Sequence, residues 1–371
     1  MHISRNQSKQ ITFLSEEYLG NCKRVLYMSP MAIGDYIYQG AFLKALSEKH
    51  PHLKIDLWID DCRTKKKIWH AGRNTVMDQW LSSEPYINYV YKMPANSAER
   101  EQNIKEAWSR DYDVIVFVTT SRISDFAAIA LKIVNTGKVL GTVSTSIIDN
   151  IFNYSVYKNL DGKIRIQNTS NYDHITDFYQ GIFHCFFELS LRDEQRILKL
   201  NLASNLIEQC EKKLSNLASQ YQLQDPKTIF INHLSTTNKR DWRLDQVEEL
   251  VLLIKKATPN SLIILNAPPH AYDDLCQWLK NNKKLNLFAI EVFTAKENFF
   301  ELPALMSQCD IVISVETAIM HLASSLNLKQ IALIRESAYR WRPKNGAKVI
   351  LGKKRVDSIP PKTVLKSMQP L

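Results

Sequence analysis

The chain has 371 residues, a length that predicts about two domains. With 45% hydrophobic residues, 23% charged residues and only 10 glycines, the composition is that of an ordered globular protein and excludes a disordered or fibrous one. The net charge of +10 indicates an anionic partner or surface, but no zinc finger, RNP-type or GXXG sequence supports nucleic acid as that partner.

Location is predicted from what the chain lacks. No apolar stretch approaches the roughly 18–20 residues that a membrane span requires. Residues 1–7 lack the apolar core of a signal peptide, and the six cysteines contain no CxxC pair, so we expect a reducing, cytoplasmic compartment. Basic clusters at 63–67, 239–240 and 353–355 are expected to be solvated, with contact to an anionic membrane surface or acidic glycolipid as the alternative.

The first half of the chain alternates short apolar runs with helical patterns. We expect strands at 24–28, 54–59, 113–118 and 138–141, and helices at about 36–49 and 124–134. Strands that alternate with helices indicate parallel βα units, so this half is predicted to be Rossmann-like.

The second half repeats this alternation after a polar and aromatic stretch, about 149–177, that we leave unassigned. We expect helices at about 204–221, 244–256 and 271–279, and strands at 228–232, 261–265, 310–315 and 330–334. The prediction is therefore an α/β protein with two doubly wound domains, 1–195 and 196–371. Two such domains facing each other would form a cleft, with ligands at the C-terminal ends of the strands.

The loop after the first strand contains Gly34 and Asp35, just before the first predicted helix. Glycine permits a turn or a close approach of backbone. Asp35 is either an ordinary N-cap or a general base at the end of the strand.

A second polar loop, 233–243, follows the strand at 228–232. It contains the hydroxyl residues Ser235, Thr236 and Thr237, followed by the cations Lys239 and Arg240. Hydroxyl donors and cations suit phosphate oxygens, so the loop is a candidate diphosphate site. The alternative is a solvated polar loop with Trp242 packed on the domain.

A third segment joins the strand at 310–315 to a helix through Glu316, Thr317 and Ala318. A helix N-terminus offers free N–H groups and partial positive charge, so it suits a diphosphate. His321 lies one turn into this helix. The alternative is a strand–helix joint capped by Thr317, with His321 merely polar at the surface.

These three segments, in this order, resemble glycosyltransferase family 9, the ADP-heptose:lipopolysaccharide heptosyltransferases. The resemblance rests on the Gly34–Asp35 step, residues 235–242, residues 315–326 and the sequence Arg-Trp-Arg-Pro at 340–343. It covers roughly residues 24–343, with only an outline match between about 60 and 225. Glu316 and Ala318 stand where the family usually has Asp and Gly, and residues 265–270 lack its usual Gly-rich turn, so the donor assignment depends most on this part of the chain.

The resemblance implies a GT-B enzyme that binds acceptor mainly in the N-terminal domain and nucleotide-sugar in the C-terminal one. It implies inversion of the anomeric centre in one displacement, without metal or cofactor, and heptose transfer from ADP-heptose to an inner-core lipopolysaccharide or related glycan. The candidate base is Asp35. The remaining candidates bind the donor: Ser235, Thr236, Thr237, Lys239, Arg240, Glu316 (sugar hydroxyls), Thr317, Ala318 and His321.

Other functions remain open at this point. One is a glycosyltransferase with a different donor or acceptor; another is a non-catalytic sugar-nucleotide-binding protein marked by Glu316 and Ala318. A nucleotide-binding oxidoreductase is disfavoured because no GxGxxG follows the first strand. The sequence Asp-Tyr-Asp at 111–113 is expected to begin a strand and not to bind manganese.

Overall fold

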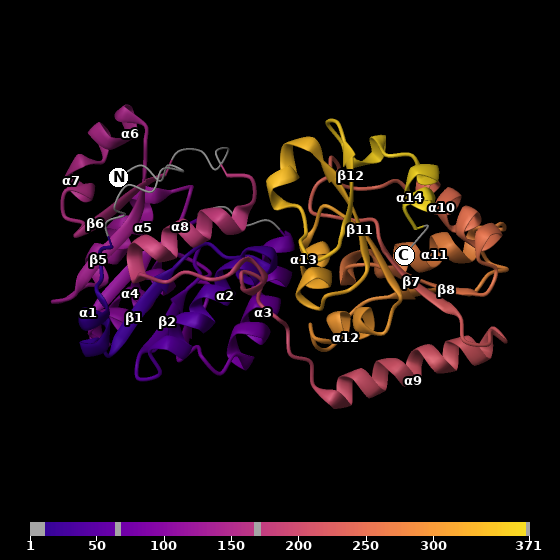
Figure 1. Ribbon diagram of the computed structural model, residues 1–371, viewed down its shortest axis with the longest axis horizontal. Helices are drawn as coiled ribbons and strands as arrows, with labels where there is room; N and C mark the ends of the chain where they lie inside the picture. Colours follow the sequence, from indigo (N-terminus) through magenta and orange to yellow (C-terminus); the bar gives the residue numbers. More distant parts are fainter. Residues whose placement is uncertain (1–11, 64–67, 167–171, 369–371) are drawn as a thin grey trace. The chain divides into compact units, whose positions relative to one another are not determined.

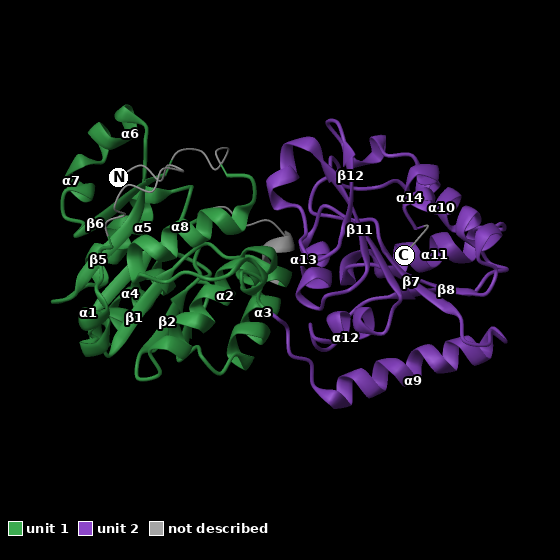
Figure 2. Cartoon of the chain, in the orientation of Figure 1, with its two compact units in different colours: residues 1–198 green, residues 199–371 purple. Residues whose placement is uncertain are grey.

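The computed structural model describes residues 12–63, 68–166 and 172–368 (Figure 1). The chain divides into two compact units, Met1–Leu198 and Lys199–Leu371 (Figure 2). The sequence-based division lies after residue 195. The assignment of acceptor and donor to the two units stays a prediction.

The N-terminal unit is built on a six-stranded parallel sheet with the order β3-β2-β1-β4-β5-β6. The strands are β1 (Arg24–Met28), β2 (Lys54–Trp58), β3 (Tyr89–Tyr91), β4 (Val114–Phe117), β5 (Lys138–Ser144) and β6 (Gly162–Ile166). The helices are α1 (Glu16–Asn21), α2 (Ile33–Lys49), α3 (Ile68–Ser83), α4 (Ser97–Ser109), α5 (Ile123–Ile133), α6 (Ile147–Phe152), α7 (Tyr154–Tyr157) and α8 (Ile175–Phe187), followed by a 3₁₀ turn at Asp193–Gln195.

The C-terminal unit repeats this plan with the order β12-β11-β10-β7-β8-β9. Its strands are β7 (Lys227–Asn232), β8 (Ser261–Asn266), β9 (Ile290–Phe293), β10 (Ile311–Val315), β11 (Gln330–Arg335) and β12 (Lys348–Gly352). Its helices are α9 (Ser204–Gln220), α10 (Leu244–Ala257), α11 (Tyr272–Asn281), α12 (Glu301–Ser307), α13 (Ala318–Ser325) and α14 (Pro361–Met368), with 3₁₀ turns at Pro269–Ala271, Glu336–Trp341 and Val356–Ser358.

When the strands of each unit are numbered 1 to 6 along the chain, both sheets have the order 3-2-1-4-5-6. This is the strand order of a Rossmann fold. The predicted α/β class with two Rossmann-like domains is therefore confirmed. Because all strands of a sheet run parallel, their C-terminal ends lie along one edge, and the loops that follow them gather there. We call this the carboxyl edge of each sheet.

The central strands are apolar on both faces, as expected for strands covered by helices on both sides. In β10 all five residues, including Ser314, are buried. Alternate residues of β11 illustrate the two faces: Ile331 and Leu333 belong to the cluster that α10 and α14 cover, whereas Ala332 and Ile334 pack with Met320 of α13. Parallel sheets of this kind take their stability mainly from burial of such side chains.

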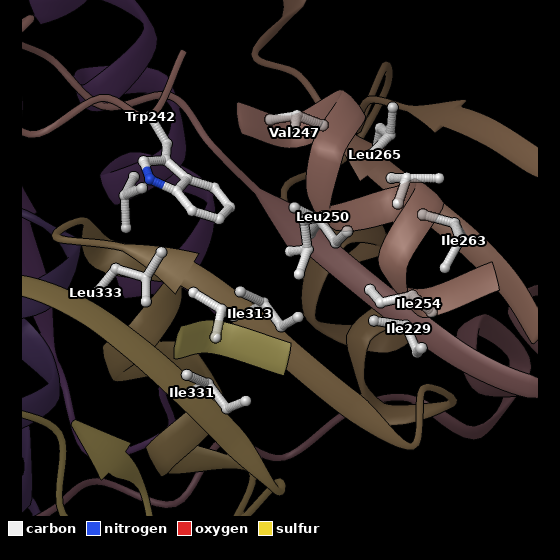
Figure 3. Close-up of a cluster of buried hydrophobic side chains, with 14 of the residues drawn as sticks. Ile229, Trp242, Val247, Leu250, Ile254, Ile263, Leu265, Ile313, Ile331 and Leu333 are labelled. Atoms are coloured by element: carbon white, nitrogen blue, oxygen red, sulfur yellow. The ribbon is translucent and has the colours of Figure 1, made fainter. Parts of the chain in front are cut away.

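Trp242 belongs to the first of these clusters (Figure 3). Its side chain is 1% exposed, and its indole Nε1 donates to the carbonyl of Ile359 at 3.0 Å. The polar loop that ends at Trp242 is thus anchored in the core, as the alternative interpretation of this residue predicted.

Several elements were not predicted, among them α3, α4, α12, β3, β9 and β12. The unassigned stretch contains most of α6, together with α7, β6 and the start of α8. Among the described residues, no helix combines the length and the hydropathy that crossing a bilayer requires.

Candidate functional site

A row of three polar side chains crosses the carboxyl edge of the C-terminal sheet. Ser314, Asn232 and Asn266 lie in register on β10, β7 and β8. Asn266 Nδ2 donates to Asn232 Oδ1 at 2.9 Å, and Asn232 Nδ2 donates to Ser314 Oγ at 3.3 Å. All three are buried, so these bonds satisfy groups that water does not reach.

The same row reaches the start of α13. Asn232 Nδ2 also lies 3.3 Å from Thr317 Oγ1, and Thr317 Oγ1 accepts from the backbone N–H of Ile319 at 3.2 Å. Thr317 is therefore the N-cap of α13, and Ala318 is the first helical residue. A helix start at a carboxyl edge presents unpaired N–H groups and the positive end of the dipole, which together favour an anion.

Glu316, just before this cap, is held by an arginine that sequence reasoning did not identify. Arg335, the last residue of β11, donates from Nη2 to Glu316 Oε1 at 2.6 Å and from Nε to Oε2 at 2.9 Å. Its backbone N–H also donates to Oε2 at 3.2 Å. These hydrogen bonds raise the pKa of the Arg335 guanidinium.

Arg240 comes from the loop after β7 and completes this group. Its Nε lies 3.6 Å from Glu316 Oε1. Glu316 is 7% exposed, and its carboxylate lies between the guanidinium groups of two partly exposed arginines, Arg240 and Arg335. One carboxylate with two guanidinium groups leaves a net positive charge beside the start of α13. The structure thus brings together Arg240 and Glu316, which are far apart in sequence, and adds Arg335.

The polar loop itself is closed by its own side chains. The backbone N–H of Ser235 donates to Asp241 Oδ1 at 2.6 Å, and Ser235 Oγ accepts from the N–H of Thr237 at 3.1 Å. Ser235 is therefore a structural residue of the turn. The side chains of Thr236, Thr237 and Lys239 are exposed to solvent.

Two basic clusters that are separate in sequence meet at this loop. The N–H of Val356 donates to the carbonyl of Lys239 at 3.0 Å, and Arg355 Nη2 donates to the carbonyl of Asn238 at 2.8 Å. Cluster 353–355 thus lies beside cluster 239–240. The cluster at 63–67 falls largely outside the described residues.

Two histidines near this edge are buried. His321 is 6% exposed, so the interpretation of it as a polar surface residue is wrong. His233 follows β7, and burial lowers its pKa to about 4, so its imidazole is neutral at physiological pH. Its Nδ1 finds no hydrogen-bond partner among the described residues.

In the N-terminal unit, Asp35 lies in the first turn of α2, which follows β1 after residues 29–32 at the carboxyl edge. The helix α2 begins at Ile33, so Asp35 is its third residue and not the N-cap. Gly34 therefore lies in the first helical turn, and the turn that we predicted for it is replaced by helix. Asp35 Oδ2 accepts from the N–H of Ala32, the N-cap residue, at 3.1 Å.

The surroundings of Asp35 favour its protonated form. Burial raises the pKa of its carboxyl group to about 6, although the Ala32 N–H and the charge of Arg73 act in the opposite direction. One turn further along α2, Gln39 donates from Nε2 to Tyr179 Oη at 3.1 Å, and Gln39 Oε1 accepts from Tyr27 Oη at 2.7 Å. A carboxyl group with a pKa near the working pH is suited to accept and release a proton.

No group of acidic, histidine or cysteine side chains suited to hold a metal occurs within the described part of the chain. In the Asp-Tyr-Asp sequence, Asp113 precedes β4, and its Oδ2 accepts from the N–H groups of Lys23 and Arg24 at 2.7 and 2.9 Å. This carboxylate therefore ties the starts of two strands together.

The chain is similar to known proteins in sequence and in fold. A family model described as glycosyltransferase family 9 (heptosyltransferase) matches residues 163–369, more than half of the chain. The match includes the whole carboxyl edge of the C-terminal sheet. No curated protein matches by sequence.

Solved structures with the same fold include a glycosyl transferase family 9 protein and two heptosyltransferases. The glycosyl transferase family 9 protein from Veillonella parvula gives a TM-score of 0.70 at 16% identity, over 96% of this chain and 98% of its own. The E. coli ADP-heptose lps heptosyltransferase II gives 0.67 at 15% identity, over 93% and 97%. The E. coli heptosyltransferase WaaC with ADP gives 0.63 at 14% identity, over 93% and 99%. At these identities the likeness shows the GT-B fold.

Proposed function

Because this chain belongs to glycosyltransferase family 9 and is a glycosyltransferase, we propose that it transfers a heptose from ADP-heptose to an inner-core lipopolysaccharide or related glycan. The observation that carries this proposal is the positively charged start of α13, where Thr317, Arg240 and Arg335 converge. The ADP in the E. coli WaaC structure supports adenine as the base of the donor.

In this proposal the C-terminal unit binds the donor. The N–H groups at Ala318 and the hydroxyl of Thr317 would bind the diphosphate, since a helix start and a hydroxyl both donate to phosphate oxygens. Thr236, Thr237 and Lys239 are exposed in the neighbouring loop and would contact its outer oxygens, with Ser235 shaping the turn. His321, buried one turn into α13, would support the same site.

Glu316 has a modified role in this site. We predicted that it accepts hydrogen bonds from sugar hydroxyls, but Arg335 already engages both of its oxygens. We therefore assign Glu316 mainly to positioning Arg240 and Arg335 toward the diphosphate. Two guanidinium groups suit the charge that develops on a departing nucleoside diphosphate.

The N-terminal unit would bind the acceptor and supply the base. Asp35 would take the proton from the attacking acceptor hydroxyl, whose oxygen bonds to the anomeric carbon as the bond to the diphosphate breaks. This single displacement inverts the anomeric centre and releases ADP. The arginines and α13 would stabilise the leaving group, so the proposal assigns no step to a metal or cofactor.

The proposed acceptor is an anionic glycolipid or glycan, consistent with the net charge of +10. The E. coli heptosyltransferase II is named for action on lipopolysaccharide, and this supports a lipid-linked acceptor here. We accordingly place the enzyme in the cytoplasm, with peripheral contact to the cytoplasmic face of the inner membrane.

One observation favours a second candidate, a transferase of the same fold with another nucleotide-sugar. Glu316 is paired with Arg335, so fewer of its lone pairs are available to read sugar hydroxyls than an unpaired carboxylate would offer. This difference lies at the donor position where the chain departs from the usual family sequence. A different sugar, or a different acceptor, would follow from it.

The experiment that separates these candidates is a thermal-shift screen with ADP-, UDP-, GDP- and CMP-linked sugars, followed by mass spectrometry of the transfer product. Stabilisation by ADP and ADP-heptose alone would support the main proposal. Stabilisation by another nucleotide would favour the second candidate, and stabilisation by none would contradict donor binding altogether.

The loop assignment has its own test. Lys239→Ala and Arg240→Ala should each weaken ADP binding about tenfold or more in calorimetry, because charge-assisted hydrogen bonds contribute about 1.5–3 kcal/mol. Arg243→Ala is the matched control, because Arg243 is an exposed arginine of the same loop that pairs with Asp245. Unchanged affinity in both test variants would refute the phosphate-binding role of this loop.

A further inference from the structure

The helix α6 presents apolar side chains to solvent. Ile147, Ile148, Ile151 and Phe152 are between 68% and 81% exposed, and Tyr154 at the start of α7 is 66% exposed. Positions i, i+1, i+4 and i+5 share one side of a helix, so the four α6 residues form a continuous strip. We call these five side chains the α6 apolar strip.

The polar side chains of the same helix are bound locally. Asn150 Nδ2 donates to the carbonyls of Ser144 and Ser146 at 2.7 and 2.6 Å. Asp149 accepts from Asn153 Nδ2 at 3.0 Å and from Tyr157 Oη at 3.1 Å. The usual arrangement of a surface helix, with its apolar side on the core, is therefore reversed in α6. These bonds fix the apolar strip in its outward orientation.

The strip lies at a defined place in the N-terminal unit. The helix α6 follows β5 after residues 145–146, at the same carboxyl edge at which residues 29–32 lead from β1 to α2 and Asp35. Only β4 separates β1 from β5 in the sheet, so the two loops start about 10 Å apart. Figure 1 shows α6 and α7 at the margin of this unit, beyond β5 and β6.

Cations slightly outnumber carboxylates in residues 144–166, the segment that carries the strip: Lys158, Lys163 and Arg165 against Asp149 and Asp161. Lys158 is the C-cap residue after α7, and Arg165 lies in register with Val143 of β5. Both are exposed, and neither forms an ion pair with any described residue. Both carboxylates accept hydrogen bonds from their own unit: Asp149 as described, and Asp161 Oδ2 from the N–H of Val139 at 2.8 Å. An apolar strip bordered by cations complements an anionic lipid surface.

The size of the strip argues against a second copy of this chain as its occupant. The helix α6 has six residues and is about 9 Å long. A stable protein interface buries about 800 Å² on each partner, which is more than a helix of this length supplies. Two copies would also bring their cations together. Insertion of a short helix about 5–10 Å into the headgroup boundary needs no such area.

We propose that α6 and the start of α7 insert into the headgroup region of an anionic phospholipid bilayer, with Lys158 and Arg165 on the lipid phosphates. This inference rests on the proposed function for its biological sense, because it would hold the acceptor-binding unit at a membrane-embedded acceptor. It assigns the membrane contact to a surface that sequence analysis did not identify.

The test is flotation of the full chain with vesicles of phosphatidylcholine and phosphatidylglycerol at 7:3, and with phosphatidylcholine alone. The protein should float with the mixed vesicles, and the triple variant Ile148→Ser/Ile151→Ser/Phe152→Ser should lower its partition coefficient at least about tenfold. Lys158→Gln/Arg165→Gln should also lower it about tenfold, with a weaker salt dependence than the parent chain. Leu287→Ser, which removes an 83% exposed leucine from the C-terminal unit, is the control and should float unchanged.

Three results would overturn the inference: no flotation of the parent chain, flotation unchanged in the triple variant, or a concentration-dependent dimer in light scattering that the triple variant abolishes. ADP binding, measured on every variant, separates this inference from the proposed function. If a strip variant loses flotation but still binds ADP, the result bears on the membrane surface alone. If the parent chain and all variants bind no nucleotide, the result contradicts the proposed donor and leaves the membrane inference to the flotation assay.

Discussion

The carboxyl edges of the two sheets follow the same topology but carry different chemistry. In the C-terminal unit the edge is a connected network, from Asn266 through Asn232 to Thr317. A second network joins Arg240, Glu316 and Arg335 beside it. In the N-terminal unit, Asp35 accepts one backbone hydrogen bond, and burial raises the pKa of its carboxyl group to about 6.

This contrast suggests a division of labour. A network of fixed donors and cations suits a ligand whose negative charge is always present, such as a diphosphate. A single carboxyl group with a raised pKa suits a transient proton transfer. We therefore infer that the same fold is used for permanent charge in one unit and for a titrating group in the other.

The largest effect should come from removing the titrating group. Asp35→Asn should lower kcat about 10²–10⁴-fold, the range typical of general base catalysis, while ADP affinity stays the same. In the parent enzyme the rate should rise with pH through about 6, because the base must be ionised to act. Transfer assays across pH 4.5–8.5 and ADP calorimetry provide the measurement.

The same variant has a stability readout. The folded-state pKa of Asp35 lies above its ordinary value of 3.8, so ionisation lowers the free energy of unfolding as the pH rises from about 4 to about 6. Asp35→Asn should flatten that part of the stability curve. A parent-like rate and pH profile in this variant would exclude Asp35 as the base.

A smaller effect is expected from the arginine that holds Glu316. Arg335→Met should weaken ADP binding about 10–100-fold and lower the free energy of unfolding by about 1–3 kcal/mol, since Glu316 is then buried beside Arg240 alone. Adding Glu316→Gln should recover stability without recovering ADP affinity. Chemical denaturation and calorimetry of the single and double variants measure both quantities.

The control lies in the other unit. Arg100 makes a comparable pair with the buried Asp60 at the carboxyl edge of the N-terminal sheet. Arg100→Met should cost similar stability and leave ADP affinity unchanged. If Arg335→Met behaves in the same way, the guanidinium of Arg335 is structural and takes no part in donor binding.

The smallest effect is expected within the amide row. Asn232→Ala removes the amide that donates to Thr317 and accepts from Asn266. We expect ADP affinity to fall about tenfold, which corresponds to the free energy of one or two hydrogen bonds. Asn260→Ala is the matched control at the opposite edge of the same sheet, where Asn260 donates to the carbonyls of Gln224 and Asp225. Equal effects of both changes on ADP binding would contradict the special role of the carboxyl edge.

Much of the fold was predictable because it depends on local patterns. Buried parallel strands such as 114–117 and 311–315 are near-continuous apolar runs, and the structure places strands within one or two residues of the predictions for them. Short or half-exposed strands such as β3 and β12 carry no such pattern and were not predicted. The start of α2 was misjudged because Asp35 was taken for a cap, whereas its side chain bonds to a residue three positions earlier.

The candidate site was predictable only in part. Hydroxyl groups, cations and a helix start after successive strands indicated an anion site, and these residues do lie at one edge. The partners of those residues were not predictable. In the sequence, Arg335 is an ordinary arginine at the end of a strand, and only the structure shows its hydrogen bonds to Glu316. Asn232 and Asn266 could have been noticed, because an amide that ends each of two apolar strands is an unusual residue to bury without a partner.

The sequence alone therefore determined the fold class, the order of the elements with a clear apolar pattern, and the side chains available at the ends of those strands. These follow from periodicity and from the topology of parallel βα units. The tertiary structure decided which of these side chains are paired and which face solvent. The pairing of Glu316, the raised pKa of Asp35 and the outward apolar strip of α6 all depend on contacts between residues that local sequence does not encode.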